Sequence, residues 1–453
     1  MPTSSGKRER VSCGHRSQTL AAAIAEDQYA GYAYAYPHKT SYRELDPPVS
    51  LAEAWAAEDK SQLYLYLHLP FCEMRCGFCN LFTASQPADE LVQQTLDAIA
   101  RQSRIVAGAV QPQAIAQVAI GGGTPTYLNA SELRRVFEII RRDWPVDLGS
   151  VPFSVEVSPA TVDADKLRLM VDFGVRRISM GVQSFVERDL SSLGRPQKND
   201  QVDSAIDLIR RSGVEVFNLD LIYGNHDQTE SDWLRTVQHA LDYRPEEVFL
   251  YPLYVRELTG LGRTGRSPAE NRRHLYGLGR DLLLQAGFRQ ISMRMFRRVD
   301  VDYSTQHCCQ EDGMVGLGPG ARSYTSALHS SSEYAVSGLG VRKIIANFNE
   351  RSDEQFGRAD YGVWLNEEEQ SRRYLIRSLL QIDGLGRQAF IIQFGDDVRN
   401  LLPQVDELVE QGVAELTPDR LFLNEEGLTH SDVIGPWLYS HSVRQRMEQF
   451  HLR

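Results

Sequence analysis

An alternation of strand and helix patterns constrains the fold of this chain more than any other feature. Apolar runs of strand length recur from residue 62 onward, and amphipathic helical patterns separate them. The runs are Leu63–Leu69, Ile115–Ile120, Phe153–Val157, Arg177–Val182, Glu215–Ile222 and Val248–Tyr254. The helical patterns are Asp89–Val106, Ser131–Arg142, Asp163–Asp172, Asp200–Arg211 and Ser231–Leu241. These units predict an α/β fold whose parallel sheet curves into an incomplete barrel, because a closed barrel needs eight of them.

Three cysteines directly follow the first of these runs. Cys72, Cys76 and Cys79 are spaced C-x3-C-x2-C, and thiolates this close can converge on one inorganic centre. A cubane cluster has four irons, so three cysteines leave one iron free to chelate an amine and a carboxylate. Two other interpretations fit the spacing: a structural zinc site with His68 as the fourth ligand, and three buried structural thiols. The position after a strand favours the cluster, because α/β enzymes keep their chemistry there.

The cysteines lie in a longer motif, Tyr66-Leu-His68-Leu-Pro70-Phe71-Cys72-x3-Cys76-x-Phe78-Cys79. This motif resembles the signature of radical S-adenosylmethionine (SAM) enzymes, specifically the oxygen-independent coproporphyrinogen III oxidase (HemN-like) family. The resemblance implies that Cys72, Cys76 and Cys79 hold a [4Fe-4S] cluster. It implies that SAM caps the fourth iron and is split reductively to a 5′-deoxyadenosyl radical, which abstracts a hydrogen atom. It also implies a partial (β/α)6 radical SAM barrel.

The loop after the second predicted strand reads Gly121-Gly122-Gly123-Thr124-Pro125-Thr126. Consecutive glycines let backbone groups approach a ligand closely. The same segment occurs in the family, and the resemblance implies that Gly122, Gly123 and Thr124 contact SAM.

Glu156 ends the third predicted strand between two valines. A carboxylate in apolar surroundings is costly to bury without a partner. It is either one half of an ion pair with an arginine such as Arg177 or, as the resemblance implies, a hydrogen-bond acceptor for SAM.

Further segments resemble the family at later strand ends. The resemblance implies that Gln183, Arg195, Asp220 and Phe78 line a site for a second SAM molecule, and that Tyr66 belongs to the first SAM site. From the residues alone, Arg195 can equally be a surface charge and Asp220 a cap. The expected cofactors are therefore one cluster and one or two SAM molecules.

The sequence departs from the family at positions near its substrate. An extra cysteine of the family is Leu81 here, a Leu-Pro pair is Asn225-His226, and a histidine is Gln197. An Asp-His pair of the family is replaced by Arg294-Met295, which cannot exchange protons at neutral pH as Asp and His can. We expect the radical chemistry to be kept and the substrate end to be altered.

Basic side chains gather around and after the sixth predicted strand, namely Arg256, Arg289, Arg294, Arg297, Arg298 and Arg322. Guanidinium groups bind carboxylates in a bidentate manner, so this set suits the propionates of a tetrapyrrole. It suits equally a solvated face that pairs with Asp300, Asp302 and Glu311.

Changes in pattern divide the chain into five segments. The prediction is a mobile polar leader (1–18), an N-terminal arm (19–61), the barrel (62–300), a connecting segment (301–366) and a C-terminal domain (367–453). The arm has a helical stretch, Thr19 to Asp27, and an alternation from Tyr32 to Tyr36 that predicts either a strand or an extended segment. It packs on the barrel or lines its mouth.

The connecting segment contains Gly316-Leu-Gly-Pro-Gly-Ala321, which lacks the lysine of a phosphate loop and indicates close backbone contact. The C-terminal domain is predicted to be winged-helix-like. The supporting patterns are helices at Glu368–Leu380 and Val398–Gln411 and a hairpin of Ala414–Leu416 with Leu421–Leu423.

Composition limits the compartment and the partners. The net charge of −11 argues against a nucleic-acid partner, and the longest apolar runs are too short to span a membrane. Six cysteines in 453 residues, without a secretion signal, predict a reducing, cytoplasmic compartment. Cys308 and Cys309 are adjacent, which strains a mutual disulfide, so we expect two ordinary thiols.

The resemblance implies an oxidoreductase that receives electrons from a reduced flavodoxin- or ferredoxin-type donor. Its small-molecule substrate is a porphyrinogen, as in coproporphyrinogen III oxidase, whose propionates undergo oxidative decarboxylation, or a related compound. One alternative is a HemW-like haem-binding or trafficking protein with His226 or His307 as axial ligand. The others are radical methyl or methylene transfer to a non-porphyrin substrate, and a zinc-stabilised protein without redox chemistry.

Overall fold

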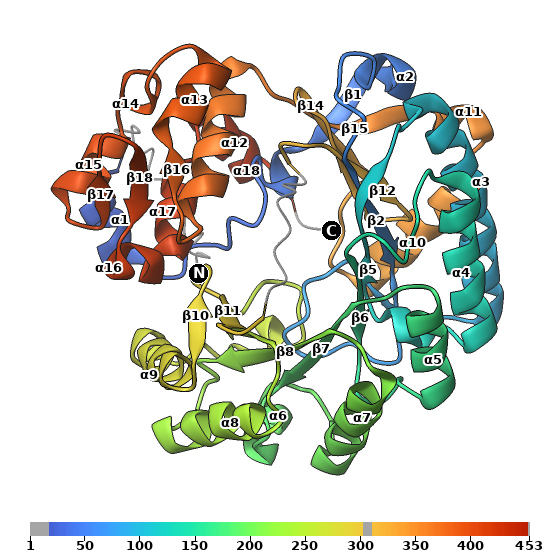
Figure 1. Cartoon of the computed structure of the whole chain (residues 1–453), viewed down its shortest axis with the longest axis horizontal. Coiled ribbons are helices and arrows are strands. Elements are labelled where there is room, and N and C mark those ends of the chain that lie inside the picture. The colour runs from blue at the N-terminus through green and yellow to red at the C-terminus, as the bar shows by residue number, and fades with distance from the viewer. Residues whose placement is uncertain (1–17, 302–309, 452–453) are drawn as a thin grey trace, which may run out of the picture.

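The predicted parallel strands form the centre of one large curved sheet (Figure 1). A computed structural model describes residues 18–301 and 310–451, so the predicted leader up to residue 17, His307, Cys308 and Cys309 lie outside it. The central strands are β2 (Leu63–Leu69), β5 (Ile115–Gly122), β6 (Phe153–Val157), β7 (Arg177–Gln183), β8 (Val216–Tyr223) and β9 (Glu247–Pro252). Each pairs in parallel with the next, which confirms the six predicted strands and the incomplete barrel.

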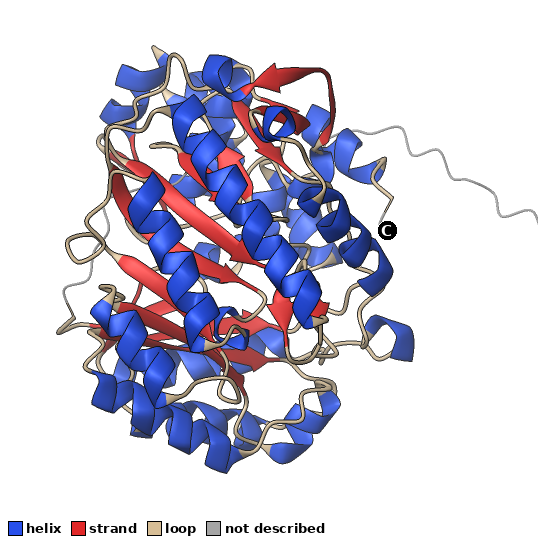
Figure 2. Ribbon diagram, turned by 90° about the vertical axis from the view of Figure 1, so that its right-hand side faces the viewer, coloured by secondary structure: helices blue, strands red, loops and turns tan. Residues whose placement is uncertain are grey.

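Helices cover the outer, convex face of these strands (Figure 2). They are α3 (Asp89–Val110), α4 (Ala130–Asp143), α5 (Ala164–Asp172), α6 (Glu187–Ser192), α7 (Asn199–Ser212), α8 (Glu230–Asp242) and α9 (Arg272–Gln285). α4 shows why the prediction holds, since Asn129 and Glu132 form a capping box and the apolar stripe of the helix is buried. The glycine corners at Gly174, Gly213 and Gly287 have positive φ, as predicted for helix ends.

The sheet continues beyond the barrel on both sides. β12 (Met314–Leu317) adds in parallel to β2, and β13 (Arg322–Tyr324), β14 (Leu328–Ser331), β15 (Arg358–Trp364) and β1 (Arg43–Ser50) follow in antiparallel order. β11 (Met295–Arg298) and β10 (Phe288–Gln290) extend it past β9. The described residues thus contribute 13 strands to one sheet. β1 escaped prediction because it contains Pro47 and Pro48, which an edge strand tolerates.

The glycine-rich segment Gly316–Ala321 lies against the end of β2. A Cβ on Gly318 would lie 2.3 Å from the backbone oxygen of His68, and one on Gly316 would lie 2.2 Å from that of Arg322. Both distances are far below van der Waals contact, which confirms the predicted close backbone approach.

The arm packs on two parts of the molecule. The predicted helical stretch is confirmed as α1 (Leu20–Glu26), which Thr19 caps. Residues 32–36 form no strand, so the strand alternative was wrong and the extended one remains. Their tyrosines alternate between neighbours: the Tyr32 ring contacts Tyr251 of β9, and Tyr36 is buried against the C-terminal unit. The alternating tyrosines therefore reflect packing against two parts of the molecule and do not reflect strand pairing.

The C-terminal unit has its own core, shared with α1 and Tyr36 (Figure 1, red and orange). Its helices are α12 (Glu367–Leu379), α13 (Arg387–Phe394), α14 (Val398–Leu401), α15 (Val405–Glu410), α16 (Glu425–Thr429), α17 (Ser431–Trp437) and α18 (His441–Glu448). The hairpin is confirmed as β17 (Ala414–Leu416) with β18 (Arg420–Leu423), and β16 (Leu385–Gly386) pairs beside it. The single predicted helix Val398–Gln411 was wrong, because Pro403 interrupts it between α14 and α15. The winged-helix interpretation and the segment boundaries remain predictions.

Short elements complete the described chain: η1 (Lys39–Ser41), α2 (Leu51–Ala54), β3 (Phe71–Cys72), β4 (Ala84–Ser85), η2 (Pro125–Tyr127), η3 (Gly262–Thr264), α10 (Gly338–Asn349) and α11 (Asp353–Phe356). β3 and β4 pair in parallel and bracket the cysteine loop. Within residues 18–301 and 310–451, no helix has both the length and the apolar character that a membrane crossing requires.

Candidate active site

The predicted site residues converge on one cleft at the carboxyl ends of the central strands. The cleft has a cavity volume of about 170 Å³ and opens to solvent. The predicted residues that line it are Cys72, Cys76, Phe78, Cys79, Gly122, Gly123, Thr124, Glu156, Gln183, Arg195 and Asp220. Only Tyr66 of the predicted set is absent from this lining.

The cysteine loop is held at both ends by backbone contacts. Gln86 N–H donates to the Cys72 carbonyl at 2.9 Å, which closes the β3–β4 pair. In the middle of the loop, Gly77 N–H donates to the Leu193 carbonyl at 3.0 Å, and a Cβ on Gly77 would lie 2.8 Å from that oxygen. Glycine is needed there because the loop crosses directly over the chain between α6 and α7.

The three thiols lie in a partly enclosed environment, and each has a polar side chain close to its sulfur. Thr124 Oγ1 lies 3.6 Å from Cys72 Sγ, and Arg195 Nη1 lies 3.2 Å from Cys76 Sγ. Burial raises the pKa of the Cys72 thiol to about 12 and also raises the pKa of Cys79. Bound metal cations would offset this cost, because their positive charge stabilises the thiolates that metal binding requires.

His68 does not join the cysteines, contrary to the zinc interpretation. Its Nε2 lies 3.1 Å from the Phe82 carbonyl and its Nδ1 lies 3.1 Å from the Tyr66 hydroxyl, so both ring nitrogens are occupied. Within the described residues, no three His, Cys, Asp or Glu side chains converge closely enough for a single metal ion. Thiolates spread around a cavity suit a multi-iron cluster, whose ligands bind different corners.

The glycines of the Gly121–Thr126 loop are required by the protein itself. A Cβ on Gly122, which has φ +113°, would lie 2.6 Å from the His68 ring, and one on Gly123 would lie 2.4 Å from the Phe71 carbonyl oxygen. Gly123 N–H donates to the Leu69 carbonyl at 2.8 Å. These contacts bring the cleft-lining backbone beside the cysteine loop, so the segment both shapes the cleft and fixes the loop.

Glu156 points into the cleft and is not paired with Arg177. Its Oε2 accepts a hydrogen bond from Gly122 N–H at 3.1 Å, whereas Arg177 pairs with Glu247 at 2.8 Å. The carboxylate reaches the solvent of the cleft, yet the surrounding protein desolvates it and raises its pKa to about 7. An acceptor with free lone pairs inside the cleft agrees with the hydrogen-bonding role, and the ion-pair alternative was wrong.

Asp220 and Gln183 face the cleft from neighbouring strands. Asn218 Nδ2 donates to Asp220 Oδ1 at 2.8 Å and Ser179 Oγ lies 3.4 Å from Oδ2, while burial raises the pKa of Asp220 to about 6. Gln183 ends β7 with φ +72°, a region that residues other than glycine rarely adopt. Asp220 lies within β8, so it is not a helix cap.

Arg195 is half-buried and anchored, which excludes a free surface charge. Its Nη2 donates to the Gly181 carbonyl at 2.6 Å and its Nε donates to Gln197 Oε1 at 3.0 Å. Gln197 in turn donates to the Val182 carbonyl at 3.1 Å. Gln197, one of the departures from the family, thus serves to hold Arg195.

Two functional candidates were missed from the sequence. Thr83, whose hydroxyl lies 4.0 Å from Cys79 Sγ, has no motif of its own. Lys39 of the arm lies with Nζ 3.6 Å from the centroid of the Tyr334 ring, and Tyr334 donates to the Asn80 carbonyl of the cysteine loop. The Lys39 and Tyr334 contacts join segments about 250 residues apart or more, so no local pattern could have indicated Lys39.

Comparisons with known proteins agree with this geometry. The pattern that describes the Radical SAM superfamily matches residues 66–240, which include the cysteine loop and most of the cleft. The chain is 26% identical over 390 residues to the heme chaperone HemW of Bacillus subtilis (strain 168), covering 82% of this chain and 98% of that protein. It is also 26% identical over 436 residues to the oxygen-independent coproporphyrinogen III oxidase of Escherichia coli (strain K12), covering 89% and 93%.

The chain belongs to the radical SAM superfamily, in its HemN/HemW family. The solved structure of coproporphyrinogen III oxidase (HemN) from Escherichia coli has the same fold, with a TM-score of 0.77 and 21% identity over 90% of this chain and 96% of that one. Membership implies a [4Fe-4S] cluster and SAM, and the three cleft thiols fit such a cluster.

The structure shows where the residues lie that differ from the family motifs. Leu81 is half exposed beside Cys79, and His226 lies at the surface with Nδ1 2.9 Å from the Ser267 carbonyl. Arg294 is buried and binds Asp432 of α17 through Nη2 at 2.6 and 2.7 Å. Of the predicted basic set, Arg298 pairs with Asp300, Arg297 pairs with buried Glu247 and Arg294 pairs with Asp432, so these residues do not form one solvated face.

Proposed function

We propose that this chain is a radical SAM enzyme whose cluster is held by Cys72, Cys76 and Cys79. The observation that carries the proposal is the convergence of these thiols with Glu156 and Asp220 on one cleft. When bound by these cysteines, a cluster would supply the one-electron chemistry for reductive cleavage of SAM and hydrogen abstraction from the substrate, with the electron delivered by an external donor.

The protein's own groups bind and orient SAM. Glu156 and the backbone of Gly122 and Gly123 offer acceptors and donors next to Cys72, in reach of an ammonium and a carboxylate. Asp220 and Gln183, on the neighbouring strands β8 and β7, suit ribose hydroxyls or a second SAM molecule. The arm and the C-terminal unit flank the incomplete side of the barrel, which limits access of water to the radical (Figure 1).

For the substrate we propose a carboxylate-bearing, porphyrin-related molecule. Arg322 is held by the hydroxyls of Tyr34 at 2.9 Å and Tyr324 at 3.3 Å, and Lys39 lies over Tyr334 nearby. Hydroxyls do not neutralise a guanidinium, so an anionic group of the substrate is favoured there.

Oxidative decarboxylation as in HemN is one candidate reaction. Arg294, however, is occupied by Asp432 and exchanges no proton, which favours a reaction that needs no acid–base pair at this position. Methyl or methylene transfer from a second SAM molecule meets that condition.

A second candidate is HemW-like haem binding, because a heme chaperone matches along 98% of its length. Of its two proposed axial ligands, His226 is at the surface and is not part of the cleft lining, and His307 lies outside the described residues. Haem titration decides this candidate: a Soret band that His226→Ala and His307→Ala leave unchanged would remove both ligands.

The enzyme proposal is tested with protein reconstituted anaerobically with iron and sulfide. Incubation with dithionite, SAM and coproporphyrinogen III should release 5′-deoxyadenosine, and C76A should abolish that release. 5′-Deoxyadenosine without a decarboxylated product would keep the radical class and exclude this substrate. Undiminished release in C76A, or a colourless protein that contains zinc and no sulfide, would refute the proposal.

A further inference from the structure

Each of the three thiols has its own side-chain hydrogen-bond donor. The three donor–sulfur distances are 3.2 Å from Arg195 Nη1 to Cys76, 3.6 Å from Thr124 Oγ1 to Cys72, and 4.0 Å from Thr83 Oγ1 to Cys79. Once the cysteines are thiolates, they carry no proton, so the hydroxyl and guanidinium groups are the donors in all three contacts. The Arg195 contact is the shortest and the only charged one of the three.

The position of Arg195 is fixed independently of the sulfur. Gly181 and Gln197 accept from two other guanidinium nitrogens at 2.6 and 3.0 Å, and these acceptors are neutral. Among the described residues, the guanidinium contacts carbonyl, amide and thiol groups and no carboxylate. Its positive charge is therefore held at Cys76 without an internal counter-ion, where a negatively charged cluster would supply one.

We propose that Arg195, with smaller contributions from Thr124 and Thr83, sets the reduction potential of the cluster. The inference rests on the proposed function, because it requires the cluster. Reduction adds one electron from the donor to the cluster without a proton, so the reduced form carries one more negative charge. Hydrogen bonds and a fixed cation at the sulfurs stabilise this form more than the oxidised form and raise the potential.

Arg195 acts on the cluster through the Cys76 sulfur, so it is a positioning residue and touches neither substrate nor the reacting carbon. Gln197 belongs to the same device, because it fixes the guanidinium plane against the Val182 carbonyl. The role differs from a SAM-binding one, since it acts before any SAM is bound.

The test is a redox titration of the reconstituted, full-length protein without SAM, followed by electron paramagnetic resonance. R195M should lower the ratio of reduced to oxidised cluster at a given potential by at least tenfold, which is a midpoint shift of about 59 mV for one electron. R195K keeps the charge and loses the planar fork, so its midpoint should lie between R195M and the wild type. T124V and T83V, which remove one neutral donor each, should lower the midpoint by less.

The matched control is R188M on α6, which removes the same charge from an exposed side chain paired with Asp232. Its midpoint should equal that of the wild type. An R195M midpoint equal to the wild type, at equal iron and sulfide content, overturns the inference, even if SAM then binds more weakly. If R195M holds no cluster, the midpoints of T124V and T83V test the inference instead. Midpoints equal to the wild type in both variants overturn the inference. A wild-type protein without a cluster instead refutes the proposed function.

Discussion

Replacing Arg294 with methionine should destabilise the docking of the C-terminal unit on the barrel. Arg294 and Asp432 have side chains only 4% and 1% exposed, and their hydrogen bonds are 2.6 and 2.7 Å long. Methionine keeps most of the volume but leaves Asp432 as a buried carboxylate whose remaining described donor is the Tyr254 hydroxyl. Removing one partner of a buried ion pair costs about 3–5 kcal/mol, so R294M should lose that much unfolding free energy.

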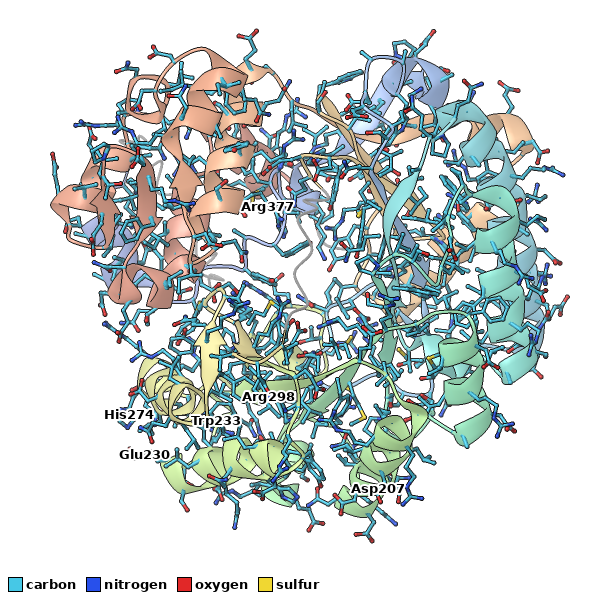
Figure 3. All side chains as sticks on the ribbon, viewed as in Figure 1. Asp207, Glu230, Trp233, His274, Arg298 and Arg377 are labelled. Atoms are coloured by element: carbon cyan, nitrogen blue, oxygen red, sulfur yellow. The ribbon has the colours of Figure 1, made fainter. Side chains whose placement is uncertain are left out.

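The assay is urea unfolding followed by tryptophan fluorescence, with limited proteolysis to detect release of the C-terminal unit. The control is R298M, because Arg298, labelled in Figure 3, pairs with Asp300 at the surface and should contribute at most about 1 kcal/mol. The double variant R294M/D432L should be more stable than R294M, since it removes the orphaned charge. Equal urea midpoints for R294M and R298M would refute the proposal that the Arg294–Asp432 ion pair stabilises the docking of the C-terminal unit.

Three further results are expected. The pKa of Glu156 is raised to about 7, so its ionised fraction rises about tenfold from pH 6 to pH 8. Because the ionised carboxylate is the proposed acceptor for SAM, the SAM affinity of the wild type relative to E156Q should rise by the same factor in equilibrium binding. A ratio that does not change with pH contradicts the acceptor role. G123A places a Cβ 2.4 Å from the Phe71 carbonyl oxygen, so it should lower the unfolding free energy by about 1–3 kcal/mol and reduce the iron content after reconstitution. G108A, with open space around the new Cβ, should not lower the urea midpoint. Y36F removes the donor to buried Glu369 and should cost about 1–3 kcal/mol, with faster proteolysis of the arm as the readout; unchanged proteolysis would show that Tyr36 does not anchor it.

The central strands could be read from the sequence because each is a short, mainly apolar segment that lies between amphipathic helical patterns. β2 and β6 were predicted to the residue, and the others to within two residues. β1 and the break at Pro403 were harder, since proline interrupts the pattern that identifies a strand or a helix. β12, β13 and β14 were not assigned as strands because each has only three or four residues, and the seven-residue β15 was missed as well.

The site divides in the same way. Covalent spacing brings Cys72, Cys76 and Cys79 together in any fold, and strand ends place Glu156 and Asp220 at one edge of the sheet. Tyr66 shares the motif and lies on the same face of β2 as His68, because residues two apart in a strand point the same way. Its hydroxyl is 3.1 Å from His68 Nδ1, a contact that the motif alone does not predict.

By itself the sequence determined the alternating strands and helices, the three clustered thiols and the glycines that let the chain pass between them, since all of these depend on residues close in sequence. Only the tertiary structure decided which charge meets which partner. Arg195 lies 119 residues from Cys76 and Arg294 lies 138 residues from Asp432, and no periodicity records such a pairing. Contacts of this kind depend on how the barrel closes and where the C-terminal unit docks, which is a property of the whole packed chain.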